Sequence, residues 1–396
     1  MKRKTKLQKN VVLYNMSKFV NTAGNLTFPL LTYLLLKTLL IQEAYIGVYI
    51  MIINMMKIPG YLLGGIVGDW FNYKRIAALF PMVCGSLMIA CDFLIDRKYI
   101  VIILLCLSKF FSGVASPSSV KIMDALTNKN NKKEIFAQTY MTTNIGMAIA
   151  AICSGYLFNI SAYLVFTIDG ITRILSGLII FLIKFKLPEK YEKKIDKKQN
   201  RKGVWGYMTQ KRLQGYIFVT SLFMYIYSQY SYAIPLELDN IFVTNSESVY
   251  SIVLLTNCIT VIVATPIMKK FSKKIEPLKC IQISFGLFLV GFCMYYIELN
   301  VVEIVLSTIL WSLGEVLFGI NELVYIAEKV EKDYFARTVS IYDSMQNIIS
   351  SLAPMINSFF ILRLSLKISW LSLGFLCIIG ALYIFIIRRN NAKERS

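Results

Sequence analysis

Histidine is absent from the 396-residue sequence, and charged residues make up only 17% of it. The lack of histidine excludes imidazole metal sites, Ser-His-Asp catalysis and histidine proton shuttles. No P-loop pattern (GxxxxGK[ST]) is present, so nothing indicates direct drive by ATP. The eight cysteines lie in apolar stretches and form no CxxC pair, which indicates buried free thiols rather than disulfides or a zinc site. We expect no cofactor.

Hydrophobic residues make up 56% of the chain, and the mean hydropathy is +0.57. They occur in blocks of roughly 20 residues or more, which is enough for a helix to cross a hydrocarbon core of ~30 Å. These blocks leave little room for a soluble catalytic domain, so we expect that the protein is not an enzyme. The pattern predicts an all-α integral membrane protein with twelve spans, at residues 11–36, 44–68, 76–95, 99–120, 136–159, 161–185, 213–236, 247–268, 278–297, 301–326, 336–362 and 368–387.

The distribution of basic residues predicts the orientation of the chain. Of the 43 Lys and Arg residues, 34 lie in the tails and the even-numbered connections, whereas 5 lie in the odd-numbered ones. The positive-inside rule therefore places both termini in the cytoplasm, with the protein in the plasma or inner membrane. The net charge of +20 then reflects orientation and anionic lipid headgroups rather than nucleic acid. The first span is too long for a cleavable signal peptide and contains Lys18, so we expect it to remain.

The twelve predicted spans divide six and six around one long charged connection. Residues 187–211 are too charged to pack as a core, although Trp205 and Tyr207 suit a short segment at headgroup depth. We expect a six-helix bundle over residues 1–186, a cytoplasmic linker over 187–211 and a second bundle over 212–396. Some transporters with this arrangement consist of two pseudo-symmetric bundles that rock about a central site.

The connection between the second and third spans carries the most specific motif. It resembles the G-x-x-x-D-x-x-G-R-K-R motif of the major facilitator superfamily, although Asn72 and Tyr73 depart from it. The four matching residues are Gly65, Asp69, Lys74 and Arg75. Because Asp69 ends a helix on the cytoplasmic side, it could pair with cations or a helix N-terminus and latch the two halves. The alternative is a simple loop with snorkelling charges.

Other motifs extend this resemblance along the chain. Lys109 occupies the usual Arg position of the superfamily's motif in the fourth span, a residue that the family links to proton transfer. Residues 146–155 resemble the antiporter motif of the fifth span, with Ala150 and Ala151 in place of Gly-Pro. Residues 228–236 and 311–315 resemble stretches of drug exporters. Overall the chain most resembles the multidrug drug:proton antiporter branch, which implies two six-helix bundles.

Three glycines in the second span, at positions 60, 64 and 68, form a stripe along one helix face. A partner helix can approach closely there, so we interpret the stripe as helix packing. Asp169 and Arg173 are four residues apart and are predicted to form an intramembrane ion pair.

Acidic residues in the second half are candidates for proton coupling. Glu315 and Glu322 lie seven residues apart on one face of the tenth span, without a basic partner on that helix. A carboxylate removed from water can bind and release a proton in the functional range. We predict Glu315 as the main coupling residue, followed by Glu322, Asp343 and Lys109. The alternative is pairing of these acids with Lys18, Lys57 or Lys109.

Aromatic and polar residues of the seventh span predict a substrate cavity. Its members are Phe223, Tyr227, Gln229 and Tyr230, beside an expected kink at Pro235, and Asn25 of the first span is added to them. Aromatic faces near an acidic residue suit planar, amphipathic or cationic molecules. The alternative for each residue is an ordinary core position.

The sequence therefore predicts a monomeric secondary transporter that exports hydrophobic or cationic compounds against proton entry. Substrate would bind near the midplane, and protonation of Glu315 would bias which side is open. Uptake of a small metabolite, by symport or facilitated diffusion, is one alternative, and a non-transporting membrane receptor or assembly factor is another. The expected partners are the substrate, protons and lipid.

Overall fold

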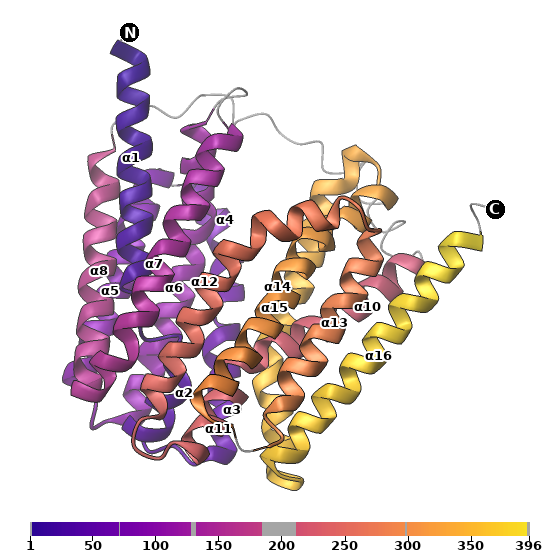
Figure 1. The fold of residues 1–396 in the computed structure, drawn as a ribbon. Helices are drawn as coiled ribbons and strands as arrows, with labels where there is room; N and C mark the ends of the chain where they lie inside the picture. The colour runs from indigo at the N-terminus through magenta and orange to yellow at the C-terminus, as the bar shows by residue number, and fades with distance from the viewer. Residues whose placement is uncertain (1, 71, 128–131, 184–210, 298, 394–396) are drawn as a thin grey trace. The chain divides into compact units, whose positions relative to one another are not determined.

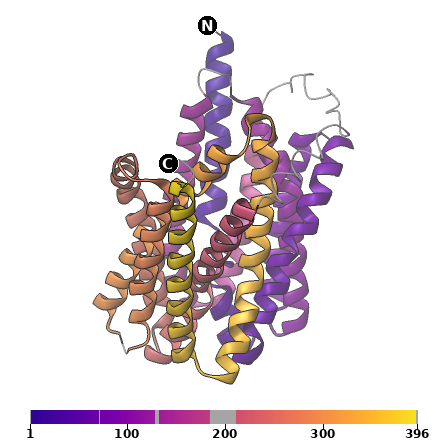
Figure 2. The same cartoon turned by 90° about the vertical axis from the view of Figure 1, so that its right-hand side faces the viewer.

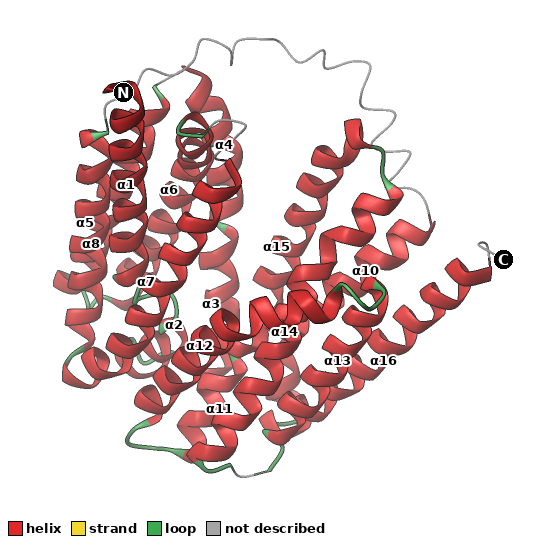
Figure 3. Cartoon of the chain, turned by 45° about the horizontal axis from the view of Figure 1, so that its top comes forward, coloured by secondary structure: helices red, strands yellow, loops and turns green. Residues whose placement is uncertain are grey.

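A computed structural model describes residues 2–70, 72–127, 132–183, 211–297 and 299–393. Every regular element in these ranges is a helix, as Figure 3 shows, and they contain no strand. This confirms the predicted all-α membrane class. The predicted linker 187–211 lies outside the described residues except for Lys211, at which a helix begins.

The chain forms two compact units. The N-terminal unit contains Met1–Glu192 together with Thr244–Ile252, and the C-terminal unit contains Lys193–Val243 together with Val253–Ser396. Each unit is described by itself below.

The helices of the N-terminal unit come from the first six predicted spans (Figure 1). They are α1 (Lys2–Ala23), α2 (Leu31–Tyr33), the π-helical turn η1 (Leu34–Thr38), α3 (Glu43–Met55), α4 (Lys57–Trp70), α5 (Tyr73–Phe93), α6 (Lys98–Ala125), α7 (Lys132–Ile160) and α8 (Ala162–Leu182). α5 packs along both α6 and α8, and α1 packs against α7 and α8.

The helices of the C-terminal unit come from the last six predicted spans. They are α10 (Lys211–Tyr227), the 3-10 turn η3 (Ser228–Ser231), α11 (Ala233–Ile241), α12 (Ser246–Ser272, which begins in the N-terminal unit), α13 (Pro277–Met294), α14 (Val301–Lys329), α15 (Lys332–Arg363) and α16 (Leu366–Lys393). α13 packs against α14 and α16, and α16 is one uninterrupted helix, drawn in yellow in Figure 2.

Ten helical segments of the described residues are long and apolar enough to cross a bilayer. The first and seventh predicted spans account for the other two, and each is interrupted. The predicted spans 11–36 and 213–236 are thus each present as shorter helices separated by a break.

The first span breaks between α1 and α2, at residues 24–30. Pro29 has no N–H to donate to a helical hydrogen bond. The backbone N–H of Thr27, also within the break, donates to the side chain of Asp169, with 3.1 Å between Thr27 N and Asp169 Oδ2. Non-helical backbone at membrane depth requires such substitute partners, because lipid provides none. A polar side chain of α8 thus takes the place of a helical hydrogen bond.

The seventh span breaks at η3, upstream of the expected kink at Pro235. Proline cannot donate to the carbonyl four residues earlier, which is that of Ser231, so a continuous α-helix would lose one backbone hydrogen bond in this stretch. The side chain of Gln229 donates to the Tyr225 carbonyl at 3.2 Å, and the Ser228 hydroxyl bonds the same oxygen at 2.9 Å. Pro235 itself lies in the first turn of α11, where the missing N–H costs nothing.

Small residues allow α4 to lie directly against α6. A Cβ atom added at Gly60 would collide with the carbonyl oxygen of Phe110, and one added at Gly64 would collide with that of Val114. From the other side, Gly113 is equally close to the Lys57 carbonyl. Gly60 and Gly64 of the glycine stripe therefore lie on a helix-packing face, as their spacing indicates.

Candidate functional site

Glu315 of α14 lies in a hydrogen-bonded site of the C-terminal unit. Its Oε1 accepts a 2.9 Å hydrogen bond from the hydroxyl of Tyr227, and its Oε2 accepts a 2.7 Å bond from the side-chain amide of Asn257. Asn257 is held in turn by a 2.9 Å bond to Ser312 Oγ. Within the described part of this unit, no Lys or Arg forms an ion pair with Glu315. The carboxylate therefore has neutral donors and no resident cation.

Aromatic rings surround this carboxylate. The ring centroids of Tyr227 and Tyr230 are 4.9 Å apart, and Tyr230 stacks on Trp311 at 5.9 Å. The ring centroid of Phe288 is 6.2 Å from that of Tyr227 and 6.3 Å from that of Trp311. Tyr227 and Tyr230 are partly exposed. A carboxylate among aromatic faces is a suitable environment for an organic cation.

Glu322 and Asp343, the other predicted coupling acids, have different surroundings. Glu322 Oε2 accepts a 3.3 Å hydrogen bond from Tyr342, and its backbone carbonyl accepts a 2.5 Å bond from Tyr216. Asp343 is exposed on α15, and its backbone carbonyl is bonded by Asn347. Of the three acids, only Glu315 has both carboxylate oxygens bonded to side chains in the described chain.

Two predicted cavity residues have their side chains buried in the core of the C-terminal unit. Phe223 is 1% exposed and stacks on Phe318 at 3.8 Å. Gln229 is completely buried, and its Oε1 accepts a 3.0 Å hydrogen bond from Asn357, which in turn accepts one of 2.7 Å from Ser369. These contacts tie the break of the seventh span to α15 and α16.

In the N-terminal unit, Asp169 and Arg173 form an ion pair within α8, with 2.5 Å between Arg173 Nε and Asp169 Oδ1. Both side chains are buried. Arg173 also donates to the Asn25 side chain at 2.8 Å, and Asp169 accepts from the Thr27 backbone. Asn25 therefore lies at the break of the first span, on the ion pair.

Lys109 of α6 lies at the same break. Its Nζ is 3.6 Å from the centroid of the Phe28 ring, and the Arg173 guanidinium is 5.5 Å from that ring. Cations over an aromatic face are stabilised by the ring quadrupole. Asn25 and Phe28 of the break therefore lie together with Lys109 of α6 and the ion pair of α8.

The predicted latch lies at the end of α4 and the start of α5. Gly65 and Asp69 belong to α4, but the side chain of Asp69 lies outside the described part of the structure. Lys74 Nζ donates a 2.8 Å hydrogen bond to the carbonyl of Phe181, in the last turn of α8, and Arg75 is exposed. A cation at a helix C-terminus satisfies a carbonyl that has no intrahelical partner.

A second ion pair lies in the N-terminal unit, between Lys37 of η1 and Glu247 in the first turn of α12. Their charged atoms are 2.7 Å apart, and Glu247 is the more buried partner. Lys37 also donates to Ser246 Oγ at 2.9 Å, and the Tyr33 hydroxyl donates to the Ser246 carbonyl at 3.1 Å. Nearby, Ser154 of α7 bonds Ser251 at 3.0 Å.

Comparison with known proteins places this helical chain in a family. The family model described as "Major Facilitator Superfamily" matches residues 16–244 and 241–396, which together are nearly the whole chain. The chain belongs to the Major Facilitator Superfamily. It is accordingly a membrane transporter for small molecules and not an enzyme.

Relatives of this superfamily member share its fold at low sequence identity. An uncharacterized MFS-type transporter of Bacillus subtilis (strain 168), YqjV, is 20% identical over 306 residues, which cover 76% of this chain and 73% of that protein. The nucleoside transporter NupG has a TM-score of 0.78 at 14% identity, covering 96% of this chain and 98% of its own. An auto-inhibited POT family peptide transporter has a TM-score of 0.74 at 13% identity, covering 96% of each chain.

Two members of the described sites are missing from the sequence-based predictions for this superfamily member. Asn257 is a polar amide within an otherwise apolar stretch of the eighth span, and that contrast was a usable signal. Nothing in the local sequence marks Phe28 as a site residue, because its position over the cations depends on Lys109 of α6 and Arg173 of α8.

Proposed function

We propose that this transporter exports hydrophobic or cationic small molecules in exchange for protons. The supporting observation is the Glu315 carboxylate, which is bonded by the neutral donors Tyr227 and Asn257 and lies beside aromatic rings. An organic cation can occupy the aromatic faces while its charge is balanced by the carboxylate. The multidrug branch suggested by the sequence motifs is consistent with this chemistry.

Coupling follows from competition at one carboxylate. A proton and an organic cation each neutralise Glu315, so binding of the cation favours release of the proton. A transporter whose conformational equilibrium depends on which of the two is bound exchanges them across the membrane. Glu322 and Asp343 serve as secondary proton sites in this proposal, and Lys109 of the other unit as a further titratable group.

The latch residues and the orientation complete the proposal. Gly65, Asp69, Lys74 and Arg75 restrict the change between the inward-open and outward-open states, with both termini in the cytoplasm and the chain acting as a monomer. The orientation is supported by the distribution of Lys and Arg along the chain.

The test is accumulation of tetraphenylphosphonium in inverted membrane vesicles with an acidic lumen. For a proton-coupled exporter, protons leave the lumen and the cation enters it, so the wild-type chain should concentrate the probe. Glu315→Gln should abolish this accumulation. Glu303→Gln is the matched control on the same helix, because glutamine can replace glutamate in the capping box that Glu303 forms with Asn300.

The same vesicles distinguish the alternatives. A proton symporter for uptake would drive its substrate out of the acidic lumen, and a receptor would produce no flux in either direction. Departure of Ala150 and Ala151 from the antiporter motif is the observation that favours uptake. Equal accumulation by the wild-type chain and Glu315→Gln would contradict the proposed role of this carboxylate.

A further inference from the structure

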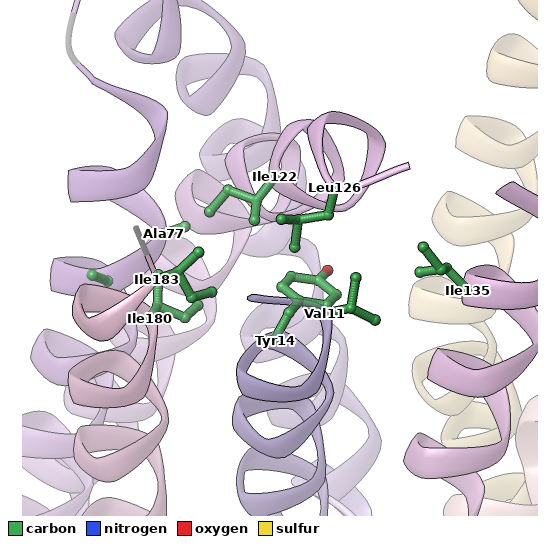
Figure 4. Close-up of a cluster of buried hydrophobic side chains, with 9 residues drawn as sticks. Val11, Tyr14, Ala77, Ile122, Leu126, Ile135, Ile180 and Ile183 are labelled. Carbon is green, nitrogen blue, oxygen red and sulfur yellow. The ribbon is translucent and has the colours of Figure 1, made fainter. Parts of the chain in front are cut away.

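The N-terminal unit contains a partly open cavity of about 360 Å³, and none of its lining residues belongs to the Glu315 site. Its lining comes from α1, α4, α5, α6, α7 and α8. One wall is shared with a cluster of buried hydrophobic side chains, to which Tyr14, Ala77 and Ile180 all belong. Figure 4 shows this cluster gathered around Tyr14 of α1. The cavity thus lies inside one six-helix bundle.

The charged residues that line this cavity are all cationic. They are Lys18, Lys57 and Arg173, and the lining residues that the structure describes include no Asp or Glu. Arg173 is neutralised by Asp169, which does not line the cavity. Lys18 is partly buried, and its hydrogen bond in the described structure goes to the neutral hydroxyl of Ser119 at 2.7 Å. The described lining therefore carries positive charge without a balancing anion of its own.

Hydroxyl groups line the same cavity as the two lysines. Ser112, Ser116 and Ser119 are spaced by four and three residues, so they share one face of α6, and all three line the cavity. Ser112 and Ser116 make no hydrogen bond to another described residue, so their O–H groups are available to donate. Lys18 also lies 5.4 Å from the ring centroid of Tyr14, whose hydroxyl donates to the Ser119 carbonyl at 3.2 Å.

Ammonium and hydroxyl donors without a carboxylate are the groups that bind an oxyanion. An unbalanced ammonium group inside a membrane protein is costly, and a bound anion offsets that cost. The lining also includes the apolar side chains of Ala77, Pro81, Val120 and Ile180, which suit a carbon skeleton. Because Lys57 is exposed, the cavity reaches the surface of the unit, which allows a ligand to enter.

We propose that this cavity binds the carboxylate or phosphate group of a small organic anion, with Lys18, Lys57 and the α6 serines as its donors. The site does not depend on the proposed export of cations. The same oxyanion chemistry is offered by a soluble organic acid and by the headgroup of an anionic lipid.

The experiment is calorimetric titration of the purified full-length chain, at one pH and without a membrane gradient, with benzoate, phenyl phosphate and inorganic phosphate. We expect saturable binding of at least one organic probe. Lys18→Met should weaken it about ten-fold, because a charge-assisted hydrogen bond is lost. Lys18→Arg should bind within a few-fold of the wild-type chain, and Ser116→Ala should weaken binding about three-fold. Lys98→Met, outside the cavity, should have no effect.

Nanodiscs identify the source of the anion. If phosphatidylglycerol, compared with phosphatidylcholine, weakens binding of the probe to the wild-type chain, the lipid headgroup occupies the site. If it has no effect, a soluble anion is the ligand. Either result supports the oxyanion site. The proposal is overturned if no probe binds saturably in detergent or nanodiscs, or if folded Lys18→Met and Ser116→Ala bind as the wild-type chain does.

Discussion

The hydroxyl of Tyr227 donates a 2.9 Å hydrogen bond to Oε1 of Glu315, which joins the end of α10 to the middle of α14. The bond lies directly before η3, at which the seventh span breaks. The carboxylate with the strongest claim to a functional role is thus attached to an interrupted span.

Removal of this hydroxyl should destabilise the chain. Tyr227→Phe leaves one oxygen of a partly buried carboxylate without its side-chain donor, which costs on the order of 1–3 kcal/mol. We expect a melting temperature in detergent that is lower by a few degrees, and no such loss when Glu315 is already leucine. Tyr225→Phe is the control on the same helix, because its hydroxyl makes no hydrogen bond to another described residue. An equal loss in both backgrounds would show that the bond contributes nothing.

Asn357 should stabilise the structure at the break of the seventh span. Asn357→Leu leaves the buried Gln229 Oε1 without its 3.0 Å donor and Ser369 Oγ without its 2.7 Å acceptor. Each unsatisfied buried group costs about 1–3 kcal/mol, so we expect a clearly lower melting temperature. Asn347→Leu on the same helix should be tolerated, because Asn347 is exposed. Similar melting temperatures for the two variants would contradict this.

Two glycine-to-alanine substitutions should have opposite effects. At Gly60 a Cβ collides with the backbone of α6, whereas at Gly319 it meets nothing within 4 Å. Gly60→Ala should therefore reduce the yield of folded protein. Gly319→Ala should be neutral or stabilising, by up to about 1 kcal/mol, because alanine favours helix. Size-exclusion profiles and melting temperatures compare the two, and a tolerated Gly60→Ala would mean that α4 and α6 can separate at little cost.

Loss of one partner of the α8 ion pair should be worse than loss of both. Arg173→Met leaves Asp169 charged, completely buried and bonded to the Thr27 backbone without a counter-charge. Removing one member of a buried pair costs roughly 3–5 kcal/mol. The double variant Asp169→Asn, Arg173→Met should recover much of the folded yield. A double variant that is less stable than Arg173→Met would contradict this account.

The Lys37–Glu247 pair should follow the same rule with a smaller effect, because Lys37 is partly exposed. Lys37→Met should lower the melting temperature more than the double variant Lys37→Met, Glu247→Gln, since only the single variant leaves a buried carboxylate without its ion-pair partner. The charge-reversed pair, Lys37→Glu with Glu247→Lys, tests whether attraction alone is responsible. Destabilisation that simply adds over the two single variants would argue against a direct interaction.

The break in the first span could not be predicted from the sequence. The first span was predicted as one helix over 11–36, because its residues are apolar enough to cross a bilayer, and Gly24 and Pro29 do not by themselves require a break. The break is stable because Asp169 and Arg173 of α8 supply the hydrogen bonds that the helix loses. That compensation comes from a residue 142 positions away from Thr27.

The sequence by itself determined the class of this protein: an all-helical membrane transporter of the Major Facilitator Superfamily, with no metal or cofactor chemistry predicted. Such properties follow from segment length, hydropathy and local motifs, which depend on neighbouring residues only. Tertiary structure alone decided that Glu315 is bonded by Tyr227 and Asn257, that Phe223 and Gln229 are core residues, and that Lys18 lines a cavity whose described lining contains no acid. The physical reason is that a buried polar group must find its partner on another helix, and hydropathy does not specify which one.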